Sequence, residues 1–206
     1  MNDVSLDARL QLLDWRRRVA ELYAQVRGER DPERAWYAWR AARESLFLDH
    51  PQSPLVAGQR DAGHLPRYFD YDPSFRVVAE VVPAGAGAVD VPTSHDATSA
   101  VVRAGSVHVE LAGAVFDLEM HWLTDYAGGL LLMFRDATSG HQTYGAGRYL
   151  LDTAKGADLG SEDGGLVLDF NFAYQPSCSY DERWECPLPP RANWLTVPIL
   201  AGERLA

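Results

Sequence analysis

Residues 106–123, SVHVELAGAVFDLEMHWL, decide the fold class. Apolar and polar side chains alternate on both sides of a glycine-containing turn at residues 112–113, which is the period of a β-strand with one buried face. A two-residue turn at this point pairs His108 with Asp117 across the two strands. The stretch therefore predicts an antiparallel β-hairpin with a polar face.

The same two-residue period recurs through residues 67–206. The predicted strands are Arg67–Tyr71, Phe75–Val82, Ser99–Ala104, Ser106–Leu111, Val115–Leu123, Leu130–Phe134, His141–Leu151, Leu166–Ala173 and Leu195–Ile199. Many short strands separated by turn residues indicate an antiparallel β-barrel or sandwich. Residues 175–194 contain four prolines, so we expect an ordered loop there rather than a central strand.

Two helices are expected before the strands. Leucines from Leu6 onward fall on helical spacing, and Gly28 is placed to end that helix. Asp31 followed by Pro32 is a typical start for a second helix, which would end before His50.

The predicted fold class is therefore mostly β, α+β by count, with two N-terminal helices. A chain of 206 residues suits one domain. We expect a helical arm at residues 1–50, an extended crossing loop at 51–66 and a β domain at 67–206.

Charge and hydropathy restrict the partners. Arginines and acidic residues cancel in residues 1–50, so the net charge of −10 lies in the β part. An acidic domain repels phosphate backbones, so nucleic acid is not an expected partner. No apolar run reaches the roughly 20 residues of a membrane span, and the N-terminus does not resemble a secretory signal. We therefore expect an acidic cytoplasmic protein.

The polar face of the hairpin is a candidate metal site. Its candidate ligands are His108, Asp117, Glu119 and His121. Histidine and carboxylate groups gathered on one face can hold a metal ion or move protons. The alternative is the solvent face of an antiparallel sheet, which has the same pattern and is the favoured interpretation.

A second group of candidates lies in the last third of the chain. Gly145 and Gly147 fall inside a predicted strand just before Arg148, an arrangement that would let a ligand approach the backbone beside a cation. Alternation in residues 166–174 puts Asp169 and Asn171 on one face and the neighbouring aromatic side chains on the other. A buried pair between Asp169 and Arg148 is therefore predicted, and such a pair is as often structural as functional.

Two cysteines, Cys178 and Cys186, lie in the proline-rich loop. A structural disulfide is not expected in the cytosol, and two cysteines alone do not complete a zinc site. A thiol nucleophile would need a histidine brought in by the fold. The chain has no G-x-S-x-G motif of a serine hydrolase.

These segments resemble the domain of unknown function 1684 family, a group of uncharacterised bacterial proteins. The matching residues are Asp136, Thr138, Gly140, Thr143, Tyr144, Gly145, Gly147, Arg148, Asp169, Phe170, Asn171, Ala173, Tyr174, Pro176, Cys178, Cys186, Pro187, Leu188, Pro189, Pro190, Asn193, Leu195, Ala201, Gly202 and Glu203. Gln175 departs from the asparagine of many relatives. The resemblance implies a mostly β domain and no known activity, cofactor or substrate. The site that it implies consists of Tyr144, Arg148, Asp169, Asn171, Tyr174, Cys178 and Cys186.

Three functions fit this sequence. The first is binding of a small molecule, with Arg148, Asp169 and Asn171 as polar contacts and tyrosines as walls. The second is a hydrolase, metal-assisted if the hairpin ligands converge. The third is an interaction module whose Trp-rich second helix docks a partner or a second copy, so that a homo-oligomer is possible. The sequence does not choose a cofactor, and it does not decide between an enzyme and a binding protein.

Overall fold

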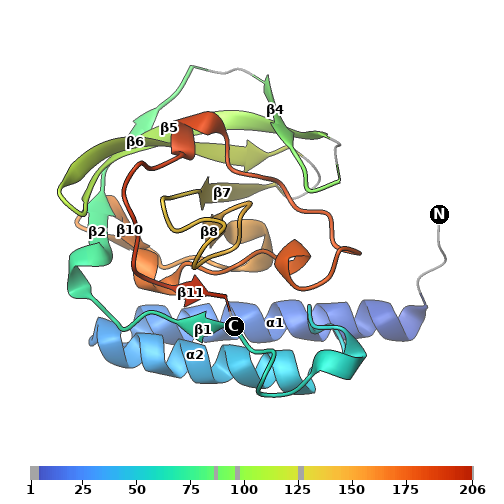
Figure 1. The fold of residues 1–206 in the computed structure, drawn as a ribbon. Coiled ribbons are helices and arrows are strands. Elements are labelled where there is room, and N and C mark those ends of the chain that lie inside the picture. The colour runs from blue at the N-terminus through green and yellow to red at the C-terminus, as the bar shows by residue number, and fades with distance from the viewer. Residues whose placement is uncertain (1–4, 86–87, 96–97, 125–127, 206) are drawn as a thin grey trace.

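The computed structural model describes residues 5–85, 88–95, 98–124 and 128–205 (Figure 1). The helices are α1 (Leu6–Gly28) and α2 (Pro32–Asp49). The strands are β1 (Arg67–Tyr68), β2 (Arg76–Ala79), β3 (Val81–Pro83), β4 (Ala88–Pro92), β5 (Thr98–Leu111), β6 (Ala114–Leu123), β7 (Gly129–Phe134), β8 (Arg148–Asp152), β9 (Ser161–Glu162), β10 (Gly165–Asp169) and β11 (Glu203–Arg204). The predicted α+β class with two N-terminal helices is confirmed.

The helices begin where the sequence predicts. The Asp31 side chain accepts hydrogen bonds from the backbone N–H groups of Glu33 (3.1 Å) and Arg34 (3.2 Å) at the start of α2, which satisfies donors that the helix itself leaves free. Trp36 and Trp39 on α2 are each only 1% exposed. Because these rings pack against the β part, the Trp-rich face expected to dock a partner is occupied inside the molecule.

The largest sheet has six strands in the order β3-β5-β6-β7-β8, with β4 also paired to β5. The predicted hairpin is confirmed, including the pairing of His108 with Asp117. Ala112 and Gly113 adopt positive φ angles of 50° and 76° at the tight turn, as a two-residue hairpin connection requires. The two predicted strands at 99–111 form one continuous strand with a register shift after Arg103.

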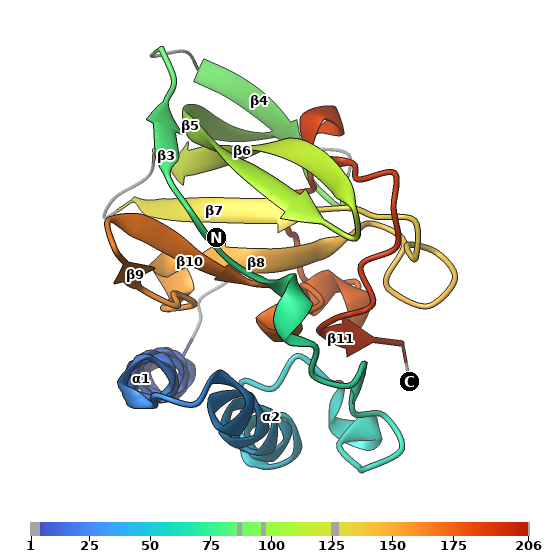
Figure 2. The same cartoon turned by 90° about the vertical axis from the view of Figure 1, so that its left-hand side faces the viewer.

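Two smaller antiparallel sheets complete the fold, β2-β10-β9 and β1-β11. The main core lies between the β2-β10 pair and the large sheet, and includes Val107, Leu118, Phe134 and Leu168. Within the described residues these sheets remain separate and do not close into a barrel. Figure 2 shows both helices below the sheets, where they cover one end of the β part.

Some predicted strands differ from the observed elements. Residues 195–199 lie outside the strands, and Pro198 has no N–H group to donate to a ladder. Strand β4 was not predicted. The predicted strand at 141–151 is reduced to β8, because the preceding residues fold into turns around the buried Asp136 side chain, which accepts from Thr138 N at 2.7 Å.

The predicted strand at 166–173 ends at Asp169. The Asp169 side chain accepts a hydrogen bond from Asn171 N (3.0 Å) and caps a short 3-10 helix at Phe170–Phe172. Alternation therefore fails here, because both Phe170 and Asn171 are fully buried. In the described part of the chain, neither helix is apolar enough over a sufficient length to cross a membrane.

Candidate functional site

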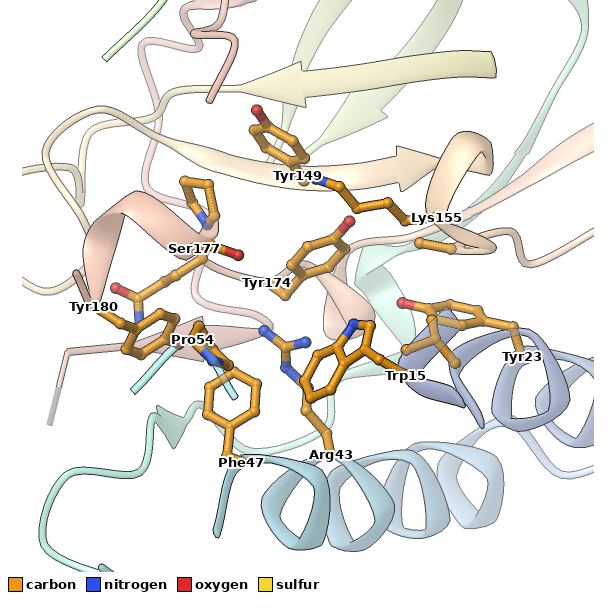
Figure 3. A pocket seen from close by; sticks show the side chains of 14 residues that line it. Trp15, Tyr23, Arg43, Phe47, Pro54, Tyr149, Lys155, Tyr174, Ser177 and Tyr180 are labelled. Carbon is orange, nitrogen blue, oxygen red and sulfur yellow. The ribbon is translucent and has the colours of Figure 1, made fainter. Parts of the chain in front are cut away.

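An aromatic cleft lies between the helices and the β part, at the end of the molecule where β8 and the proline-rich loop meet α1 and α2 (Figure 3). It has a cavity volume of about 70 Å³. Its aromatic walls are Trp15, Tyr23, Phe47, Tyr149, Tyr174 and Tyr180. Two cationic side chains, Arg43 and Lys155, also line it.

Arg43 extends from α2 into the cleft and forms an ion pair with Glu203, through Nε to Oε1 and through Nη2 to Oε2 (3.2 Å). Glu203 is fully buried and also accepts from Gln175 N (2.7 Å) and Tyr180 Oη (3.1 Å). Burial opposes the charge on Arg43, but the carboxylate of Glu203 beside it raises the pKa of the guanidinium. Arg43 therefore stays charged at neutral pH.

The Arg43 guanidinium also contacts aromatic rings. Its carbon lies 4.6 Å from the ring centre of Phe47 and 4.8 Å from that of Tyr174, a range in which cation–π attraction is significant. Among the described residues, none accepts a hydrogen bond from Nη1. The N–H groups of Nη1 are thus left for another acceptor.

Lys155 provides the second cation. Its Nζ lies 3.2 Å from Asp152 Oδ2. The Lys155 side chain is half exposed. Partial desolvation opposes the ammonium charge, but the neighbouring Asp152 carboxylate favours it, and the pKa of Lys155 is raised overall. In Figure 3 the lysine side chain extends along the cleft toward the rings of Tyr149 and Tyr174.

Tyr174, one of the predicted site residues, stands between these two cations (Figure 3). Burial raises its pKa well above the usual value, so the hydroxyl keeps its proton. In the described parts of the chain we find no hydrogen-bond partner for Tyr174 Oη, whereas Tyr149 Oη donates to Pro187 O at 2.6 Å. The hydroxyl of Tyr174 is therefore a third donor that faces the cleft.

Arg148 lies elsewhere, in the core, with no exposed surface. Its Nη2 donates to Asp136 Oδ2 (2.8 Å) and to Ile199 O (2.9 Å), and its Nη1 donates to the carbonyls of Ala201 and Glu203. The predicted pair with Asp169 is wrong, because the partner of Arg148 is Asp136. Through these hydrogen bonds Arg148 connects β8 to the C-terminal segment.

Gly147 shows the close approach that its sequence context predicts, but the approaching group is the chain itself. A Cβ atom at this position would lie 2.5 Å from the carbonyl oxygen of Phe134. The φ angle of Gly147 is +102°, which a residue with a side chain rarely adopts. The glycine at this position therefore allows two backbone segments to pack closely beside Arg148.

Asp169 and Asn171 also hold the backbone. Asn171 accepts from Asp72 N (3.0 Å) and donates to Asp72 O (2.8 Å), which fixes the loop before β2. Burial raises the pKa of Asp169 to about 6, although hydrogen bonds from Asn171 lower it in part. Asp169 borders a second, smaller cavity of about 60 Å³ that Arg27 and Arg76 also line.

The two cysteines are neighbours in space and both are free thiols. Cys186 is buried and packs with Leu131, Met133 and Tyr149, and Cys178 packs against this cluster while remaining partly exposed. Tyr144 lies within hydrogen-bonding reach of Cys178. The fold therefore brings three predicted site residues together at the proline-rich loop, beside the aromatic cleft.

The four candidate metal ligands of the hairpin separate into two pairs, His108 with Asp117 and His121 with Glu119, whose Nε2 and Oε2 atoms lie 3.7 Å apart. His108 Nδ1 lies 2.9 Å from Asp117 Oδ1 on the exposed face, while Glu119 pairs with Arg103 at 3.0 Å. His121 is fully buried. Across the described residues there is no group of three or more His, Cys, Asp and Glu side chains that could hold a metal ion. The solvent-face interpretation therefore holds for His108 and Asp117.

Residues of the family motif form the core around Arg148, the turn at Asp169 and the loop that contains the two cysteines. The model of the protein of unknown function family DUF1684 matches residues 65–204. The chain belongs to the DUF1684 family. The family resemblance inferred from the sequence is thus confirmed.

A similar structure has been solved by solution NMR, that of an uncharacterized protein from Haloarcula marismortui. It is 37% identical to this chain, with a TM-score of 0.61, and the match covers 84% of this chain and 93% of that one. Because Haloarcula is an archaeon, the expectation of a bacterial family is too narrow. No curated protein matches the chain.

Sequence reasoning missed most of the cleft. Trp15 and Lys155 lie far apart along the chain and share no local pattern. Glu203 matches the family motif but was not among the predicted site residues. One signal was present at Arg43, which falls on the same helical face as Trp36 and would therefore be buried with it. A charged side chain on an otherwise apolar, aromatic helix face indicates a buried ion pair or a ligand contact.

Proposed function

We propose that the cleft between the helices and the β part binds a small anionic molecule that carries an apolar or aromatic group. The observation that carries the proposal is an excess of donors. Arg43 Nη1, the remaining Lys155 protons and Tyr174 Oη are donors of cleft-lining residues. The Glu203 carboxylate already accepts from Arg43. Asp152 Oδ2 pairs with Lys155, which leaves only Asp152 Oδ1 as a free carboxylate oxygen of this group among the described residues. A ligand with acceptor oxygens satisfies these donors, and a guanidinium is well suited to a carboxylate or phosphate.

The walls favour an apolar part on the same ligand. Ligand sites are mostly apolar with a few placed polar groups, and aromatic rings form most of this lining. The cavity of about 70 Å³ is roughly half the size of an engineered cavity of about 150 Å³ that holds benzene. The cleft therefore accommodates one anionic head group and the start of an apolar part, and the rest of such a ligand would extend out of the cleft.

The two other functions receive less support. A metal-assisted hydrolase would need the hairpin side chains to converge. Instead, His108 and Asp117 are exposed, Glu119 pairs with Arg103 and His121 is buried. An interaction module based on α2 would need Trp36 and Trp39 at the surface, and both are buried.

The test is a thermal-shift comparison of charged and neutral probes of one shape. We expect phenyl phosphate and benzoate to raise the Tm of the full chain in a saturable way, and benzamide to have little effect at the same concentration. The cations account for this difference, because hydrogen bonds to charged groups contribute about 1.5–3 kcal/mol and neutral ones about 1 kcal/mol.

A conservative variant locates the binding. Tyr174→Phe removes one hydroxyl that has no hydrogen-bond partner among the described residues, so we expect the fold to be retained. The affinity for phenyl phosphate should fall by roughly tenfold or more. Tyr37→Phe is the matched control, because Tyr37 is exposed on α2. If Tyr174→Phe binds phenyl phosphate as tightly as Tyr37→Phe does, or if benzamide binds as well as benzoate, the proposal is wrong.

A further inference from the structure

The cysteine pair lies next to the cleft but outside its lining. Cys178 belongs to a 3-10 turn at Ser177–Ser179, and Ser177 itself lines the cleft. Cys178 is partly exposed, whereas Cys186 is 4% exposed. Small reagents can therefore reach the Cys178 thiol, whereas the Cys186 thiol is shielded from solvent.

Cys178 packs against the buried cluster that contains Cys186. The Cys186 thiol and the Tyr144 hydroxyl act on its sulfur as hydrogen-bond donors, while Ser94 Oγ donates to Trp184 O (3.3 Å). Ser94 is fixed in place, since its N–H donates to Cys186 O (3.0 Å) and its Oγ accepts from Cys186 N (3.1 Å). A set of donors around one sulfur stabilises a thiolate.

The protonation of the two thiols follows from this arrangement. The hydrogen bond from Cys186 is the largest cause that lowers the pKa of Cys178 to about 6, against a burial effect that raises it. The same interaction, together with burial, raises the pKa of Cys186. One thiolate beside one protonated thiol is the arrangement of an attacking and a resolving cysteine.

We propose that Cys178 and Cys186 are a redox-active dithiol, in which Cys178 reduces a hydroperoxide and Cys186 then closes a disulfide. This inference is independent of the proposed ligand. A zinc site is the other common use of paired thiols, but within the described ranges no third His, Cys, Asp or Glu ligand joins them.

The reaction has two balanced steps. The Cys178 thiolate attacks one oxygen of hydrogen peroxide, the O–O bond breaks, and the leaving hydroxide takes a proton to become water. Cys178 is then a sulfenic acid, oxidised by two electrons. The Cys186 sulfur attacks the Cys178 sulfur, the S–O bond breaks, and the hydroxide leaves as water with the Cys186 proton. A dithiol such as dithiothreitol reverses the disulfide by exchange.

The reactivity of Cys178 sets a measurable rate. At pH 6 about half of a thiol with this pKa is ionised, against roughly 0.3% of an ordinary thiol with a pKa near 8.5. The less basic thiolate is a weaker nucleophile by roughly tenfold, given a Brønsted slope of about 0.4–0.5. We therefore expect iodoacetamide to alkylate Cys178 about tenfold faster than free cysteine at pH 6.

The decisive experiment treats the reduced full chain with equimolar hydrogen peroxide and follows its intact mass. We expect loss of two hydrogens per chain, a peptide that links Cys178 to Cys186, and recovery with dithiothreitol. In Cys186→Ser the reaction should stop at a sulfenic acid on Cys178, which dimedone traps. In Cys178→Ser no fast oxidation should remain.

Two further variants separate the donor cluster from general exposure. Tyr144→Phe removes one donor to the sulfur and should slow alkylation of Cys178 at pH 6, while the surface variant Tyr37→Phe should leave it unchanged. The proposal is overturned if the wild-type chain keeps both thiols under peroxide, if disulfides form only between chains, or if Cys186 reacts first. The wild-type mass measurement decides this even where a variant does not fold.

Discussion

Replacement of Asp169 by asparagine should change how stability depends on pH. Asp169 is 1% exposed. Its Oδ1 accepts from Asn171 N (3.0 Å) and Nδ2 (2.8 Å), and Tyr71 Oη lies 3.5 Å from Oδ2. These bonds do not offset burial, which raises the pKa of Asp169 to about 6 from 3.8. An asparagine keeps an acceptor for Asn171 and has no charge to bury.

The sign and size of the effect follow from proton linkage. Because the folded pKa of Asp169 is raised, its contribution to stability is fully present below pH 3.8 and is lost as the pH rises through 6. A difference of about two between the folded and unfolded pKa values changes the free energy of unfolding by about 3 kcal/mol, at roughly 1.4 kcal/mol per unit. We therefore expect Asp169→Asn to unfold with nearly the wild-type free energy near pH 4 and to be about 2–3 kcal/mol more stable than wild type at pH 7.

The assay is urea unfolding of both proteins at several values between pH 4 and pH 8. The measured quantity is the difference between the unfolding free energies of the wild type and the variant, because the other carboxylates contribute equally to the pH dependence of both proteins. Asp90→Asn, at an exposed position in β4, is the matched control and should show no such slope. A difference that stays constant with pH, or that falls as pH rises, would refute the burial argument.

Two other substitutions test the core around the family motif, both by urea unfolding at pH 7. Arg148→Met leaves the buried Asp136 carboxylate unpaired, so we expect a loss of about 3–5 kcal/mol; a loss below about 1 kcal/mol would show that the ion pair is dispensable. Gly147→Ala forces a methyl group to 2.5 Å from Phe134 O at a positive φ and should cost on the order of 1–3 kcal/mol. Gly145→Ala is its control, since the nearest atom to the added Cβ is 3.7 Å away, and equal losses at both positions would contradict the explanation.

Local chemistry explains which parts of the fold the sequence predicts. The hairpin register at His108 and Asp117 was predictable because a two-residue turn leaves one pairing. The start of α2 was predictable because Asp31 caps it and Pro32 follows. In both cases the signal lies within a few residues of the structure that it determines.

The parts that were not predicted depend on distant residues or on a side chain that overrides periodicity. Asp169 ends a strand by capping a turn, so the alternation stops earlier than the sequence pattern implies. Arg148 finds its carboxylate in Asp136 because the intervening residues fold back, and its carbonyl acceptors lie more than 50 positions along the chain. The cleft, likewise, is built by pairs such as Arg43 and Glu203, 160 positions apart.

Ligand binding in the aromatic cleft is tested most directly by NMR, with phenyl phosphate titrated into the ¹⁵N-labelled full chain. The indole N–H of Trp15, which lines the cleft, should shift in a saturable way, and that of Trp194, which is partly exposed elsewhere, should not. Tyr174→Phe should weaken the same titration by roughly tenfold or more. Shifts centred on Trp194, or no saturable shift at Trp15, would contradict the proposed function.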